Sequence, residues 1–121
     1  MAVVRIPPHD EEAEQAVLGA ILIDKDAVIT VSQLISADNF YDERHQEIYA
    51  AMMALYEERK PTDLLTITDV LKKKKMYDKV GGSAYLSSLT NVVPTAANSE
   101  YYAGIIRDKY VRRSLIQVSL S

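Results

Sequence analysis

The sequence predicts an all-α fold, a compact bundle of about five helices followed by one long helix. Apolar residues recur at helical spacing along most of the 121 residues, and they make up 48% of the chain, which is ample for one core. Glycine and proline are few, at four each, and most of them lie between the helical patterns. No segment alternates apolar and polar residues over the length of a strand. The closest, residues 64–68, is better interpreted as the start of a helix.

The first helix is predicted over Glu11–Ile23, after an extended segment that contains Pro7-Pro8. Asp10 is a suitable N-cap, because its side-chain oxygen can accept from a free backbone N–H of the first turn. The acidic residues of that turn suit the positive end of the helix dipole. A second, short helix is expected from about Asp26 to Ile35.

The middle of the chain predicts three further helices. The first of them opens at Asp42 or the residue after it. In the next, Thr66 and Asp69 resemble a capping box, and Val70 and Leu71 lie inside the helix. After a break at residues 81–82, Ser83 is expected to cap the fifth helix.

The last helix is predicted from Thr95 to Ser121, and no glycine or proline marks its end. Its apolar residues occupy two sides of a helical wheel, so it needs two packing partners, and the bundle supplies at most one. We therefore expect this helix to pack on another chain or on further sequence. One broad side holds Tyr101, Tyr102, Ile105, Ile106, Tyr110, Ile116 and Leu120, and the opposite side holds Val111, Leu115 and Val118.

Composition narrows the function classes. The net charge of −3 argues against a dedicated nucleic-acid binder, which usually carries a basic surplus. The absence of cysteine excludes disulfides, a thiol nucleophile and thiolate metal ligands. No apolar run has membrane-spanning length and the first residues do not form a signal peptide, so we expect a cytoplasmic protein without membrane contact.

No catalytic, cofactor-binding or metal-binding residue is predicted. His9 and the acidic residues after it are interpreted as a solvated first helical turn, because their side chains point in different directions. His45 has no second histidine or nucleophile at a useful spacing and is expected to pack or to face solvent. Gly81-Gly82-Ser83 lacks the lysine of a phosphate-binding P-loop.

Two features could bind a partner. Lys72, Lys73, Lys74 and Lys75 form a basic run that could contact DNA weakly, although lysines at a helix C-terminus also simply complement the dipole. Several tyrosines gather in the last third of the chain, and tyrosine suits protein interfaces because it pairs a large apolar ring with a polar hydroxyl. Tyr85 is equally compatible with an interface and with the core.

Three stretches together closely resemble the N-terminal domain of the bacterial replicative DNA helicase, the DnaB family. They are residues 7–20, 38–49 and 80–103, and they include the blocks Glu-Ala-Glu-Gln-Ala-Val-Leu-Gly and Val-Pro-Thr-Ala-Ala-Asn. The resemblance implies a hexameric, ATP-driven motor that unwinds the replication fork. Its RecA-like motor domain would follow this segment and would carry the sites for ATP and Mg²⁺, so no cofactor is expected here.

The same resemblance implies a division of the chain and a set of partners. Residues 1–97 would form the globular bundle, and residues 98–121 the first arm of a helical hairpin that pairs between subunits into a collar. The collar would dock the C-terminal domain of primase at positions that match Tyr85 and Ile116. It could also hold a helicase loader. The residues assigned to the subunit interface on the arm are Tyr102, Ile105, Ile106, Tyr110, Leu115 and Leu120.

Two alternatives stay open at this point. The chain could be a free-standing helical adaptor that binds a partner protein without any motor. It could also be a DNA-binding domain that uses Lys72–Lys75, which is the weakest of the three readings.

Overall fold

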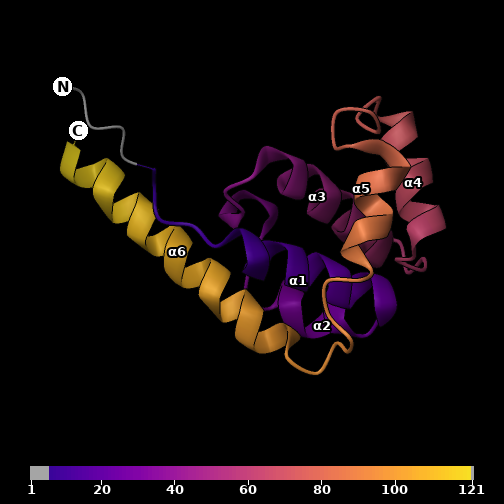
Figure 1. The fold of residues 1–121 in the computed structure, drawn as a ribbon, viewed down its shortest axis with the longest axis horizontal. Coiled ribbons are helices and arrows are strands. Elements are labelled where there is room, and N and C mark those ends of the chain that lie inside the picture. The colour runs from indigo at the N-terminus through magenta and orange to yellow at the C-terminus, as the bar shows by residue number, and fades with distance from the viewer. Residues whose placement is uncertain (1–5, 121) are drawn as a thin grey trace.

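The computed structural model describes residues 6–120, which form six α-helices and one 3₁₀ helix and contain no strand (Figure 1). This confirms the all-α class, with five shorter helices followed by a long one. The elements are α1 (Glu11–Ile23), α2 (Ala27–Ser32), η1 (Ala37–Asn39), α3 (Glu43–Glu57), α4 (Leu64–Lys73), α5 (Gly82–Leu89) and α6 (Ser99–Leu120).

Helix α1 is the centre of the bundle, because it contacts α2, α3, α5 and α6. It begins as predicted, with the Asp10 side chain accepting from the Ala13 backbone N–H at 3.0 Å. Its apolar stripe is fully buried at Val17, Leu18 and Ile21. Burial of such side chains is worth about 1.5–3 kcal/mol each, so this stripe anchors the fold.

Helix α4 begins at Leu64, in agreement with the interpretation of residues 64–68 as the start of a helix. The capping box joins Asp63 to Thr66, with the Asp63 carboxylate accepting from the Thr66 N–H at 2.9 Å. Thr66 is thus the third residue of the helix, and the predicted pair with Asp69 is wrong. Asp69 instead lies 3.1 Å from Lys73 in an exposed ion pair one turn along.

The prediction that Ser83 caps α5 is also wrong. Gly81 is the N-cap, with φ of 109°, and glycine has no side chain that could make a capping hydrogen bond. The left-handed conformation is one that glycine adopts at no steric cost. The helix therefore starts at the second glycine of the pair, and Ser83 is already inside it and exposed.

Helix α6 packs along α1 and α2 through its first half, where Ala103 and Ile106 are buried. Its second half runs on beyond the bundle, beside the segment that leads into α1 (Figure 1). We call residues 110–120 the outer half of α6. Ser121, where the helix was predicted to end, lies outside the described residues. No helix within residues 6–120 is long and apolar enough to cross a membrane.

Candidate functional site

The outer half of α6 exposes apolar side chains. Val111 is 46% exposed and Leu115 is 64% exposed, and both lie on the side of the helix that the sequence assigned to a second partner. Ile116 and Val118 are also more than a third exposed. Val111, Leu115 and Val118 share one side of the helix, and exposed apolar side chains that lie together are typical of a protein-binding face.

The residues assigned to the subunit interface on α6 do not all lie at the surface. Ile106 is only 2% exposed and belongs to this chain's own core, so its assignment to a contact between subunits does not fit the structure. Tyr102 and Ile105 are half-buried and pack against the core, and Tyr110 is half-buried as well. Leu115 is well exposed, and the side chain of Leu120 lies outside the described part.

Arg113 fastens the outer half of α6 to the bundle. Its guanidinium donates to the backbone carbonyl of Pro8 at 2.9 Å and to that of Asn39 at 2.7 Å. The same group lies 5.4 Å from the centre of the Tyr41 ring, within range of a cation–π interaction. A groove of about 1080 Å³ lies beside it, lined in part by Pro8, Tyr41, Arg113 and Ile116.

A buried polar chain connects α1, α3 and α5. Glu14 is 2% exposed and His45 is fully buried. The Glu14 carboxylate lies 2.7 Å from Nδ1 of His45, and Nε2 of His45 lies 2.5 Å from the Tyr85 hydroxyl. Since a carboxylate only accepts, Nδ1 is the donor, and the opposite nitrogen of a neutral ring accepts the Tyr85 proton. Gln15 donates to the same hydroxyl at 3.2 Å.

These buried hydrogen bonds overturn two expectations from the sequence. The first turn of α1 is not wholly solvated, because Glu14 turns inward and accepts from the Tyr41 N–H at 2.7 Å. His45 neither faces solvent nor packs as an isolated ring, since both of its nitrogens have partners. One signal in the sequence points to both residues. Glu14 shares the helical stripe of Val17 and Leu18, and His45 shares that of Ile48.

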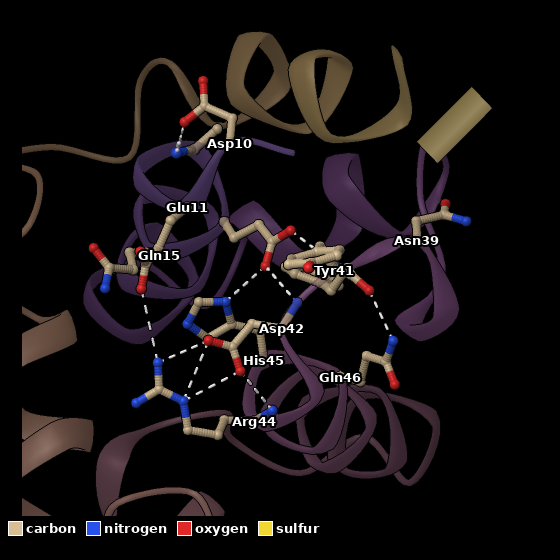
Figure 2. Close-up of polar contacts among 12 residues, drawn as sticks. Asp10, Glu11, Gln15, Asn39, Tyr41, Asp42, Arg44, His45 and Gln46 are labelled. Carbon is tan, nitrogen blue, oxygen red and sulfur yellow. Dashed lines mark hydrogen bonds and ion pairs between the residues drawn. The ribbon is translucent and has the colours of Figure 1, made fainter. Parts of the chain in front are cut away.

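A second, partly exposed layer covers the Tyr85 ring. The Arg44 guanidinium lies 4.3 Å from the ring centre and donates to the Asp42 carboxylate, at 2.7 Å for the shortest contact (Figure 2). The hydrogen bond from Arg44 holds the pKa of Asp42 below its ordinary value, and the same bond raises the pKa of Arg44. Glu11 approaches Arg44 at 3.8 Å.

Tyr85 itself is half-buried and touches the core, so it belongs partly to the interior and partly to the surface. Burial raises the pKa of its hydroxyl above the ordinary value. The hydroxyl points inward to His45, and the ring carries Arg44. Sequence reasoning found Tyr85 but not Arg44, because nothing in the local pattern around residue 44 indicates a distant tyrosine.

Lys72, Lys73, Lys74 and Lys75 are all exposed at the end of α4. Lys73 is paired with Asp69, and the Lys72 ammonium lies 4.9 Å from the Tyr77 ring centre. The run lies at the C-terminal end of α4 and just beyond it, whereas Arg44 lies on α3 and Tyr85 on α5. No group of three or more histidine, cysteine, aspartate or glutamate side chains within residues 6–120 is arranged to hold a metal ion.

The chain matches the DnaB-like helicase N terminal domain family over residues 6–108. The replicative DNA helicase DnaB of Treponema pallidum is 46% identical over 115 residues, which are 95% of this chain and 26% of that protein. The replicative DNA helicase DnaB of Geobacillus stearothermophilus is 44% identical over 117 residues, 97% of this chain and 26% of that protein. The chain thus spans about a quarter of the length of these relatives.

Two solved structures have the same fold as this chain. The N-terminal domain of DnaB helicase from Mycobacterium tuberculosis superposes with a TM-score of 0.93 at 38% identity, covering 95% of this chain and 80% of that one. The N-terminal domain of DnaB helicase from Helicobacter pylori, described together with its interactions with primase, gives a TM-score of 0.76 over 89% of this chain and 84% of that one. Its identity is 22%, so it supports the fold alone. From the family match over most of the chain and the identity to the helicases, this chain belongs to the DnaB-like helicase N-terminal domain family.

Proposed function

We propose that this chain is an oligomerisation and docking module, the collar of an ATP-driven replicative DNA helicase, and that it carries out no chemistry itself. The observation that carries the proposal is the exposed apolar surface on the outer half of α6, in a chain of the helicase family. Residues 1–97 act as the globular part, and residues 98–121 as the arm that meets another subunit.

The whole protein is proposed to be a hexameric helicase in the cytoplasm. A motor domain with ATP and Mg²⁺ would unwind duplex DNA, and the collar would hold primase beside it and could also hold a loader. Tethering two enzymes raises their effective concentration without any new catalytic group. A free-standing adaptor is the less favoured reading, because the relatives with the same sequence pattern are helicases by name.

The exposure of Leu115 and Val111 on the outer half of α6 supports the assignment of this arm to a contact between subunits. We expect the chain to self-associate weakly in sedimentation equilibrium. Leu115→Asp should weaken the dimer by about tenfold or more, since it places a charge on an apolar contact.

The matched control is Leu65→Asp on α4, where the leucine is 79% exposed and remote from α6 in the sequence. It should leave the association constant unchanged. A wild-type chain that stays monomeric at high concentration, or a Leu115→Asp chain that associates like wild type, would contradict the role of the arm.

Docking of primase is proposed at Tyr85 and Ile116, and we call the Tyr85 ring together with Arg44, which lies on it, the docking face. Partly exposed tyrosines are common anchors of protein interfaces, and Ile116 lies at the groove beside Arg113. Tyr85→Ala should cost about 1–3 kcal/mol of binding to the C-terminal domain of a bacterial primase, measured by titration calorimetry. A melting curve on the same sample checks that the variant is folded. A folded variant with unchanged affinity would remove Tyr85 from the site.

Weak DNA contact by Lys72–Lys75 is a subsidiary proposal. It is supported by the exposure of all four side chains and opposed by the net negative charge of the chain. Binding led by phosphate contacts falls steeply as salt rises, which distinguishes it from an apolar helical interface.

A further inference from the structure

We infer that Tyr41 and Asp42 form a junction that couples the packing of the outer half of α6 to the docking face at Tyr85. The partner in this inference is the one given by the proposed function, whereas the route between the two places is a set of contacts within this chain. The junction is the two-residue segment that immediately precedes α3.

On the side of α6, Arg113 holds the junction and its neighbourhood. Its two hydrogen bonds reach the carbonyls of Pro8, before α1, and Asn39, in η1. Its cation also faces the Tyr41 ring, whose other ring contact is His9 at 4.1 Å between centres. A change in how the outer half of α6 lies on the bundle therefore acts first on residues 39–41.

The first branch from the junction runs through the interior. The Tyr41 N–H donates to Oε2 of Glu14 at 2.7 Å, and the Asp42 N–H lies 3.3 Å from Oε1. That same Oε1 accepts from His45, whose other nitrogen meets the Tyr85 hydroxyl. A shift of the junction backbone thus changes the carboxylate that fixes the His45 ring, and His45 fixes the Tyr85 hydroxyl.

The second branch runs along the surface. The Asp42 carboxylate caps α3 by accepting from the Arg44 N–H at 2.9 Å. It also accepts a hydrogen bond from the Arg44 guanidinium (Figure 2). Arg44 in turn lies on the Tyr85 ring. The ring and the hydroxyl of Tyr85 are therefore held by separate branches that begin at adjacent residues.

Coupling follows because one displacement at the junction moves both supports of Tyr85 together. The affinity of the docking face for primase then depends on how the arm is packed. Coupling free energies are reciprocal, so occupation of the docking face alters arm packing by the same factor. Self-association and docking are thereby linked within one small domain.

The test is a double-mutant cycle with Arg113→Ala and Tyr85→Phe, read as the Kd of the primase C-terminal domain. Tyr85→Phe keeps the ring and removes the hydroxyl that ends the interior branch. Arg113→Ala should change the Kd by about 2- to 30-fold, the range usual for residues on a coupling route. The two changes should be non-additive, because they act on one path.

Arg107→Ala is the matched control, since Arg107 also lies on α6 and makes a single long contact, 3.4 Å to the Leu34 carbonyl. It should leave the Kd unchanged. Arg113→Lys provides a second, milder variant that keeps the charge but lacks the fork that spans two carbonyls. A chain-only readout is the amide NMR signal of Tyr85, which should shift in both Arg113 variants and not in Arg107→Ala.

The outcomes separate the two proposals. A wild-type chain that fails to bind the primase domain would overturn docking and, with it, the coupling. A wild-type chain that binds, with Arg113→Ala equal to Arg107→Ala or additive with Tyr85→Phe, would overturn the coupling and leave docking standing. A non-additive cycle with a shifted Tyr85 signal is the result expected.

Discussion

Replacing Glu14 by alanine is expected to lower the free energy of unfolding by about 2–6 kcal/mol, which is about 1–3 kcal/mol for each of two buried donors that lose their acceptor. The Glu14 carboxylate accepts hydrogen bonds from the His45 ring and from the Tyr41 N–H, at 2.7 Å each. Glu14 is only 2% exposed, so these bonds lie in the interior. Its removal leaves these donors buried without an acceptor. Urea denaturation monitored by circular dichroism measures the change.

Glu12→Ala is the matched control, because Glu12 lies in the same first turn but is exposed. It should change stability by no more than about 0.5 kcal/mol. Glu14→Gln keeps the shape and one acceptor oxygen, so its loss should fall between the two. A loss below about 1 kcal/mol for Glu14→Ala would show that the buried chain does not stabilise the fold.

Gly19→Ala should destabilise the chain by about 1–3 kcal/mol, although alanine favours helices. A Cβ at Gly19 would lie 2.2 Å from the backbone carbonyl oxygen of Leu89, so α1 and α5 would have to separate. Gly104→Ala, in α6, meets no atom within 4 Å and should instead stabilise by about 0.5–1 kcal/mol. Thermal melts of both variants compare the two signs. A stabilised Gly19→Ala chain would mean that the close approach is easily relieved.

The helices could be predicted from the sequence because their signals are local. Asp10 before an acidic turn and an apolar stripe gave the exact span of α1. The capping pair of α4 was assigned wrongly because two overlapping capping patterns compete, and only the one at Asp63 precedes the first apolar residues of the helix. The same limit applied at α5, where a glycine that accepts a positive φ displaced the serine as cap.

The polar site could be predicted only in part, because its partners are far apart in the sequence. Glu14 and Tyr85 lie far apart in the sequence. Only the packing of α1, α3 and α5 brings both side chains into contact with His45. Arg113 is more distant still from Pro8, 105 residues away. A wheel identified the exposed Leu115 correctly but could not decide that Ile106 faces the bundle, since both faces of α6 are apolar.

Sedimentation velocity tests most directly whether this chain is an oligomerisation and docking module. The chain would be run alone over a range of concentrations and mixed with the C-terminal domain of a bacterial primase. We expect a concentration-dependent dimer of the chain alone and a heavier, discrete complex in the mixture. A single monomeric species at every concentration, unchanged by the primase domain, would contradict the assignment of this domain as an oligomerisation and docking module.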